Sequence, residues 1–260
     1  MTHTAQQYDA LFSGLIGQDY DMLKLICPFA AEMSRLVGQE VGALAQQATA
    51  PFAVIELGGG TGITTLAILS ADPNLTLLSI DNEPTMQNQA KAALGDWVEQ
   101  GRLTFALNDA LSALTALPDA SSDIIASAYT LHNFEATYRQ AVLQQCHRVL
   151  KPGGHFINGD RYALDDIDAH TRNTQREVAS YFKVLTEITR LDLLEHWIIH
   201  LFSDESENHI MREGIALQQM REAGFTAIDI KLRQDVNALL TATRLTTTKP
   251  TTTKPTITTP

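Results

Sequence analysis

The chain has 260 residues, of which 44% are hydrophobic and 19% are charged, and this composition is ordinary for a globular protein. Its length is sufficient for one large α/β domain with a substantial core. The formal net charge of −11 repels phosphate backbones and anionic lipids, which argues against nucleic acid or a membrane surface as the main partner.

Residues 1–48 have helical patterning and contain no predicted strand. They lack a basic region followed by an apolar run, so we expect no signal peptide. No apolar stretch of the chain approaches the ~20 residues that span a bilayer. The two cysteines, Cys27 and Cys146, lie in apolar sequence, which favours buried free thiols in a reducing compartment. We therefore expect a cytoplasmic protein.

Strands and helices alternate through the middle of the chain. Apolar runs rich in β-branched residues predict five strands, at 52–57, 75–80, 102–107, 122–128 and 155–160. Helical patterns lie between them, at 63–71, 84–99 and 135–150, and the sequence KPGG at 151–154 predicts a helix stop followed by a turn. This alternation predicts an α/β, Rossmann-like fold in which a mostly parallel sheet carries helices on both faces.

Residues 161–209 break this rhythm and have helical patterning throughout. A helix at 214–225 and two closing strands, at 226–232 and 235–244, then complete a seven-stranded sheet. The Thr/Lys/Pro repeat that follows is expected to be disordered, because proline blocks both helix and sheet. The predicted organisation is an N-terminal helical cover (1–48), one domain (49–245) with a helical insertion at about 161–209, and a tail (246–260).

A glycine-rich turn follows the first predicted strand and reads Glu56-Leu57-Gly58-Gly59-Gly60-Thr61-Gly62. Glycine allows positive φ and a close approach of the backbone to a ligand. The helix that begins next offers free N–H groups, at the place where doubly wound sheets bind nucleotides. The dinucleotide pattern G-x-G-x-x-G would require glycine or alanine at Ile63, which disfavours an NAD-dependent oxidoreductase.

Polar residues stand at the ends of the next strands. Asp81, followed by Asn82, comes 25 residues after Glu56, and an acid at this place can accept both hydroxyls of a ribose. Asp109 ends the third strand, where it could accept from the exocyclic amine of adenine. Tyr129 ends the fourth strand, next to the reacting end of the same site.

The order and spacing of these features resemble those of the class I S-adenosylmethionine (SAM)-dependent methyltransferases. The resemblance rests on the acid-x-G-x-G-x-G pattern from Glu56, the strand-end acids and the L-K-P-G-G at 150–154, and it covers chiefly residues 50–160. It implies SAM as cofactor, S-adenosylhomocysteine as product and in-line methyl transfer to a small-molecule acceptor. The implied cofactor contacts are Tyr20, Glu56, Gly58, Gly59, Gly60, Gly62, Asp81, Asn82, Asn108, Asp109, Ala110 and Tyr129.

Tyr20 belongs to this set because the sequence Q-D-Y-D-M-L resembles the region of a cofactor-contacting tyrosine that precedes the fold in carboxy-SAM synthase and related enzymes. An aromatic side chain that only anchors the N-terminal helix to the core is the alternative.

Candidate groups for the acceptor follow the fourth and fifth strands. A protonated acceptor needs a base, and His132, which titrates near neutrality, is the predicted catalytic residue; capping the next helix is the alternative. Asp160, Arg161, His196 and His200 are predicted substrate contacts. The last two share a helix face, but they lack the H-E-x-x-H pattern and spacing fixes no third ligand, so we predict no metal site.

Three functions therefore remain open. The first is a small-molecule methyltransferase, acting as a monomer or homodimer. The second is a SAM-modifying enzyme of the carboxy-SAM synthase type, which the layout of the helical cover resembles. That chemistry would need a cation to hold a carboxylate, and Arg172, Arg176 and Arg190 are available in the insertion. The third is a non-catalytic SAM-binding protein, against which the intact glycine turn and both strand-end acids argue.

Overall fold

The computed structural model describes residues 25, 27–47 and 51–246 of the chain. Tyr20, most of the predicted N-terminal cover before Pro28 and nearly all of the tail lie outside the described residues. The elements are α3 (Pro28–Ala45), β1 (Ala53–Leu57), α4 (Ile63–Ala71), β2 (Thr76–Asp81), α5 (Pro84–Ala93), α6 (Gly95–Glu99), β3 (Leu103–Leu107), α7 (Ala110–Ala116), β4 (Ser122–Ala128), the 3₁₀ helix η1 (Leu131–Asn133), α8 (Ala136–Val149), β5 (Leu150–Arg161), α9 (Ile167–Glu187), α10 (Leu191–Asp204), α11 (Glu213–Glu222), β6 (Phe225–Gln234) and β7 (Asn237–Arg244).

The strands form one seven-stranded sheet in the order β3-β2-β1-β4-β5-β7-β6. Strands β1 to β5 run parallel, and β7 pairs antiparallel with both β5 and β6. The α/β, Rossmann-like sheet predicted from the sequence is confirmed. The strand order reverses between β1 and β4, and ligands bind outside the carboxyl ends of the strands at such a point.

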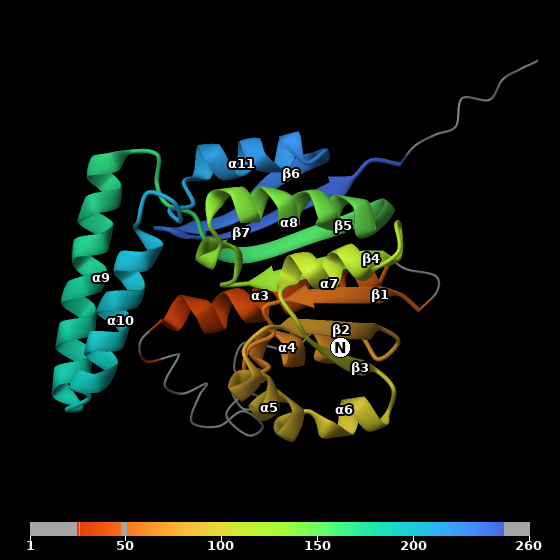
Figure 1. The fold of residues 1–260 in the computed structure, drawn as a ribbon, viewed down its shortest axis with the longest axis horizontal. Helices are drawn as coiled ribbons and strands as arrows, with labels where there is room; N and C mark the ends of the chain where they lie inside the picture. The colour runs from red at the N-terminus through yellow and green to blue at the C-terminus, as the bar shows by residue number, and fades with distance from the viewer. Residues whose placement is uncertain (1–24, 26, 48–50, 247–260) are drawn as a thin grey trace, which may run out of the picture.

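Helices cover both faces of the sheet (Figure 1). Helices α3 and α4 bury one apolar cluster against it, while α7, α8 and α11 bury a second cluster on the opposite face. Alternate residues of a strand feed the two clusters, as Val54 and Ile55 do in β1. Helices α3 and α4 meet at Gly38, where an added Cβ would lie 2.7 Å from the Ala67 carbonyl oxygen.

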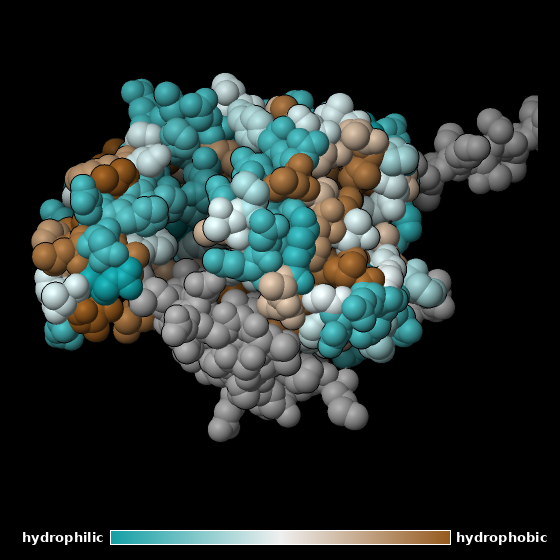
Figure 2. Space-filling view, turned by 60° about the horizontal axis from the view of Figure 1, so that its bottom comes forward, coloured by the Kyte–Doolittle hydropathy of each residue, from teal (hydrophilic) through white to brown (hydrophobic). Residues whose placement is uncertain are grey.

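Helices α9 and α10 stand side by side beyond one end of the sheet (Figure 1). Tyr181, Leu185, Leu194 and Leu201 form a buried cluster of their own between these helices. Apolar side chains also gather on the outer surface at this end (Figure 2); Phe202, for example, is 73% exposed. No described helix is long and apolar enough to cross a bilayer.

Two local predictions were wrong, and one helix was not predicted. The helix expected over 84–99 is divided at the fully buried Leu94, whose backbone leaves the helical region. The KPGG segment does stop α8, but it lies within β5 as a bulge, because the pairing moves from Ser122 with Leu150 to Ile124 with His155. Helix α7, which the Asp109 side chain caps, was not predicted.

Candidate functional site

A cavity of about 710 Å³ opens at the carboxyl ends of the parallel strands, at the reversal point of the sheet. The glycine turn, the ends of β2, β3 and β4, and side chains of α3, α9 and α10 line it. The predicted site residues on its wall are Gly58, Gly59, Gly60, Asp81, Asn82, Asn108, Asp109, Ala110, Tyr129, His132, Arg161, His196 and His200. Glu56, Gly62 and Asp160 do not line it.

The turn at 58–62, here called the glycine cradle, needs residues without a side chain at Gly58 and Gly59. An added Cβ at Gly58 would lie 2.0 Å from the Thr130 hydroxyl oxygen, and one at Gly59 would lie 2.1 Å from that of Ser79. At Gly60, where φ is +52°, an added Cβ would meet nothing within 4 Å. The turn is therefore pressed against the protein on one side, while no described residue covers its Gly60 side.

Asp81 joins the end of β2 to this turn. Its carboxylate accepts from the Gly60 N–H at 2.7 Å through Oδ2 and from the Glu83 N–H at 2.8 Å through Oδ1. Each carboxylate oxygen can accept a further hydrogen bond. Asp81 can therefore hold the turn and accept from a diol in the cavity at the same time.

Asp109 has a structural role at the end of β3. Its Oδ1 accepts from the Ser112 N–H and from the Tyr138 hydroxyl, each at 2.9 Å. These hydrogen bonds, chiefly those from Ser112, lower the pKa of Asp109 below its usual value. The carboxylate lines the cavity beside Tyr138, a residue that sequence reasoning did not single out because it follows 29 residues later on α8.

Glu56 lies behind the glycine turn rather than in the cavity. Its Oε2 accepts from the hydroxyls of Thr65 and Ser79, each at 2.6 Å, while the buried Oε1 has no partner among the described residues. Burial raises the pKa of Glu56 to about 7, against the opposing effect of the two hydroxyls. Glu56 is thus placed to anchor the turn.

Tyr129 follows β4 in a backbone conformation that non-glycine residues rarely adopt, with φ of +48°. Its N–H donates to the Gly159 carbonyl at 2.9 Å, and its phenol donates to the Asn237 side chain. These contacts from β5 and β7 hold the side chain against the cavity. Such strain costs on the order of 1–3 kcal/mol and is concentrated at functional sites.

His132 lines the same cavity as the glycine turn, and Asp160 orients it. The Nδ1 of His132 is 2.5 Å from Asp160 Oδ1. The Asp160 carboxylate also accepts from the Leu131 and Arg161 N–H groups, at 2.9 and 2.8 Å. Burial alone would raise the pKa of Asp160, but the charge and hydrogen bonds of these neighbours hold it below its usual value. Asp160, predicted as a substrate contact, is instead buried behind His132.

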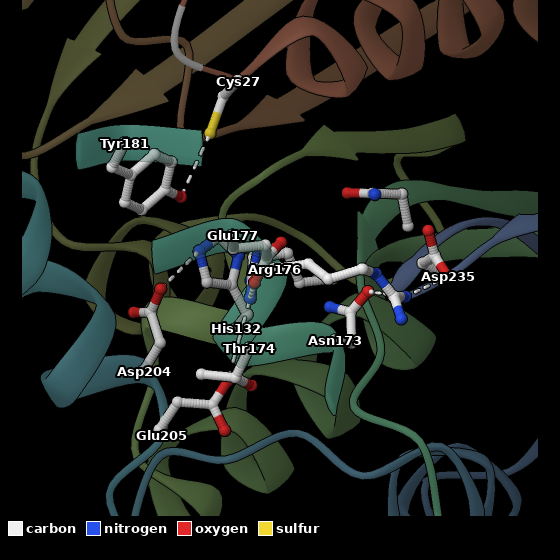
Figure 3. Close-up of polar contacts among 12 residues, drawn as sticks. Cys27, His132, Asn173, Thr174, Arg176, Glu177, Tyr181, Asp204, Glu205 and Asp235 are labelled. Carbon is white, nitrogen blue, oxygen red and sulfur yellow. Dashed lines mark hydrogen bonds and ion pairs between the residues drawn. The ribbon is translucent and has the colours of Figure 1, made fainter. Parts of the chain in front are cut away.

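His200 and Asp204 lie one turn apart on helix α10, and Asp204 lies close to both His200 and His132. Asp204 Oδ2 lies 3.6 Å from His200 Nε2 and 3.8 Å from His132 Nε2. Figure 3 shows Asp204 and His132 directed toward one another. His196, one turn before His200, stacks on it with ring centroids 6.5 Å apart. Sequence reasoning missed Asp204, although its i, i+4 spacing from His200 was visible.

Arg161 lines the cavity in a charged pair. Its guanidinium donates to both carboxylate oxygens of Glu177, at 2.8 and 2.9 Å, and lies 3.7 Å from Glu205. Among the described residues on the cavity wall, it is the one lysine or arginine. Its charge is therefore already matched inside the protein.

Apolar and aromatic side chains complete the wall beside these polar groups. Tyr181 and Trp197 lie with ring centroids 6.1 Å apart. The Cys27 thiol lies 3.8 Å from the Tyr181 hydroxyl (Figure 3), and burial raises the pKa of Cys27. Cys27 and Cys146 are both free thiols, as predicted, although Cys27 is only half-buried.

Comparisons with known proteins agree with this geometry. Residues 54–154 match the sequence profile of a methyltransferase domain family. The 2-methoxy-6-polyprenyl-1,4-benzoquinol methylase of Schizosaccharomyces pombe is 31% identical over 116 residues, which are 42% of this chain and 37% of that relative. The chain therefore spans well under half of this relative's length.

Two further proteins resemble larger parts of the chain. The carboxy-S-adenosyl-L-methionine synthase of Pseudoalteromonas translucida is 23% identical over 190 residues, 67% of this chain and 76% of that protein. The structure of an O-methyltransferase family protein from Burkholderia thailandensis superposes with a TM-score of 0.60 at 19% identity, covering 95% of this chain and 62% of that chain. This second likeness concerns the fold alone.

Proposed function

We propose that this chain, whose residues 54–154 match a methyltransferase domain family, belongs to the class I SAM-dependent superfamily and is an enzyme that transfers the methyl group of SAM to a small-molecule acceptor. One observation carries the proposal: a single cavity is lined both by the glycine cradle with Asp81 and by an oriented polar group around His132. The cavity volume of about 710 Å³ is in the range of small-molecule sites.

The donor set at the glycine end fits SAM. The open side of Gly60 leaves room for the cofactor, Asp81 can accept from its ribose hydroxyls, and Asp109 with Asn108 borders the place for its base. When bound, SAM supplies a methyl group made electrophilic by its sulfonium. The protein then has to align a nucleophile with that methyl and exclude water, and such positioning lowers a barrier by several kcal/mol or more.

The part of the cavity around His132 supports a role in binding the acceptor. His132 cannot turn freely because Asp160 holds its Nδ1, so its Nε2 keeps a fixed direction toward Asp204. Tyr181 and Trp197 provide apolar surface alongside. This combination fits a small, partly apolar acceptor whose polar group meets His132. His132 remains the residue predicted to act on the acceptor's proton.

The described residues disfavour the carboxy-SAM synthase alternative. A second carboxylate in the cavity would need a free cation, but Arg161 is held by Glu177 through two hydrogen bonds. The arginines considered in the insertion do not line the described cavity; Arg176 pairs with Asp235, and Arg190 pairs with Asp192. Methyl transfer therefore accounts better for this site.

Calorimetric titration with SAM and with S-adenosylhomocysteine tests the proposal, using the wild type, Asp81→Asn and Asp96→Asn. Asp81→Asn should weaken both ligands by about 10–100-fold, because a hydrogen bond to a charged group contributes about 1.5–3 kcal/mol. Asp96→Asn, which changes an exposed acid in α6, is the matched control and should bind like the wild type. Folded wild-type protein that binds neither ligand would refute the proposal.

A further inference from the structure

Three side chains converge at the acceptor end of the cavity from two separate segments of the chain. His132 comes from η1, and His200 and Asp204 come from one face of α10. One donor atom from each side chain lies within 4.8 Å of the other two. We propose that these residues form a site for one divalent transition-metal ion with open positions toward the cavity.

The donor set and its spacing suit such an ion. Two imidazoles and one carboxylate are ligands for Zn²⁺ and related ions, and catalytic sites use three protein ligands with a further position for water or substrate. Bonds of about 2.0–2.2 Å place neighbouring ligand atoms roughly 3–3.5 Å apart. The distances from Asp204 Oδ2 to the two imidazole Nε2 atoms are 3.6 and 3.8 Å, so small rotations of the His200 and Asp204 side chains would complete the site around the fixed His132.

His132 also has a carboxylate partner on its second ring nitrogen, as metal-ligating histidines commonly do. Asp160 holds its Nδ1 at 2.5 Å, which places the proton on that nitrogen and the free lone pair on Nε2. Metal-ligating histidines characteristically donate their other N–H to a carboxylate, which fixes both the tautomer and the ring orientation. The sequence-based prediction of no metal site considered only His196 with His200, whereas the structure pairs His200 with Asp204 and with a residue 68 positions earlier.

The electrostatics of the cluster also favour a cation. The ion pairs around the site include four carboxylates, those of Asp160, Glu177, Asp204 and Glu205. Arg161 is the one guanidinium among these pairs, and the buried Arg139 lies further back, with its own hydrogen bonds to backbone carbonyls and Gln219. With neutral imidazoles the cluster carries excess negative charge in a poorly solvated place, and a divalent ion would compensate it.

This site gives the proposed methyl transfer a class of acceptor, and this step rests on that proposed function. A hydroxyl or enol oxygen held by the ion would lose its proton to water more readily, since a bound divalent ion lowers the pKa of its oxygen ligands. The oxygen lone pair would then form the C–O bond while the C–S bond breaks and its electron pair stays on sulfur. We therefore infer an oxygen acceptor and not an amine.

The metal alone tests the site. Protein without a histidine tag is treated with chelator, dialysed and titrated with Zn²⁺ by calorimetry and with Co²⁺ by visible absorption. One equivalent should bind. His200→Ala and Asp204→Asn should weaken binding at least about 100-fold, and Asp160→Asn should weaken it about 10–100-fold, the usual cost of losing the partner of a ligating histidine.

His196→Ala is the matched control, because it removes a cavity-lining imidazole one turn away on the same helix and should leave metal binding unchanged. Failure of the wild type to bind, or binding that His200→Ala does not weaken, overturns the site. Circular dichroism of each variant checks folding.

A second arm tests the open positions. Acetohydroxamate, an oxygen ligand for metals, should shift the spectrum of the Co²⁺-loaded protein. An unchanged spectrum would mean that the ion has no coordination position open to an oxygen ligand, and this result would overturn the inferred acceptor class. SAM titration of the chelated protein separates the two proposals. SAM binding without metal binding refutes only the metal site, whereas metal binding without SAM binding refutes only the proposed function.

Discussion

Glu56 begins the predicted cofactor-binding motif but lies beneath the glycine turn, away from the cavity wall. Its carboxyl group is fully buried beneath the glycine turn and is held by two hydroxyls. A buried carboxyl group prefers to be protonated, which explains why its pKa rises to about 7. The turn is therefore supported by a group whose ionisation is costly within the ordinary working range of pH.

Glu56 should make stability depend on pH. Because its pKa is higher in the folded than in the unfolded protein, its contribution is fully present below the ordinary glutamate pKa and is lost as pH rises through about 7. Glu56→Gln removes this loss. We expect the free energy of unfolding of Glu56→Gln, relative to wild type, to improve by about 1–3 kcal/mol between pH 5 and pH 8.

Urea denaturation at several pH values measures this difference. Glu99→Gln, which removes an exposed carboxylate from α6, should not reproduce the effect. A Glu56→Gln difference that stays constant across this range would contradict the assignment of the pH dependence to Glu56.

The residues of the candidate site differ in how far local sequence could reveal them. Gly58, Gly60 and Asp81 stand at strand ends in a spaced pattern, so their convergence follows from the parallel sheet. Asp204 and Tyr138 reach the cavity from helices whose rotation depends on tertiary packing. The position of Asp160 behind His132 likewise depends on contacts 28 residues apart, which no local pattern encodes.

At the scale of elements, the contact between α3 and α4 also depends on tertiary packing that the local sequence does not reveal. Glycine at 38 and 42 looks unfavourable in a helix interior, yet at Gly38 the two helices approach so closely that an added Cβ would lie 2.7 Å from the Ala67 carbonyl oxygen. At Gly42 the nearest atom would be 3.4 Å away, an ordinary contact. The two glycines therefore have different structural importance.

Gly38→Ala should destabilise the protein by about 1–3 kcal/mol, because it overpacks a rigid helix contact. Gly42→Ala, the matched substitution one turn along α3, should be neutral or should stabilise by up to about 1 kcal/mol through helix propensity. Thermal and urea denaturation of both variants check this. Equal effects at the two positions would mean that α3 and α4 do not pack as described.

Element boundaries were predictable where a local signal coincided with the tertiary structure. Helix α4 begins directly after the glycine turn, and β4 is built around the apolar residues 124–126, so the bounds of both were predicted correctly. The break at Leu94 and the bulge at 151–154 were not predicted, because the burial of Leu94 and the pairing of β5 with β4 decide them. Both are tertiary effects on locally ambiguous sequence.

The whole molecule has cores of unequal size. The two clusters that sandwich the sheet are extensive, whereas α9 and α10 share a buried cluster of four residues. These helices also expose large apolar side chains at their outer surface (Figure 2). Regions with few buried apolar contacts open more readily than the global core.

Hydrogen exchange should reveal this inequality. We expect amides of α9 and α10 to exchange at least about 10-fold faster than those of β1 and β4, because opening the small cluster requires less free energy than unfolding the sheet. Mass spectrometry of peptides from 167–204 and from the two strands provides the comparison. Equal protection would show that the helices unfold only together with the sheet.

The residues that line the cavity come from separate parts of the chain, and this has a consequence for how the binding properties of such a protein can change in evolution. The glycine cradle and its acids come from the loops after β1, β2 and β3, while α10 supplies His196, His200 and Asp204. On the proposed function, substitutions in α10 would change the acceptor and leave the residues proposed to bind SAM unaltered. On the same proposal, a chimera that exchanges 161–209 for the corresponding segment of a protein with this fold would be expected to accept a different acceptor with the same methyl donor.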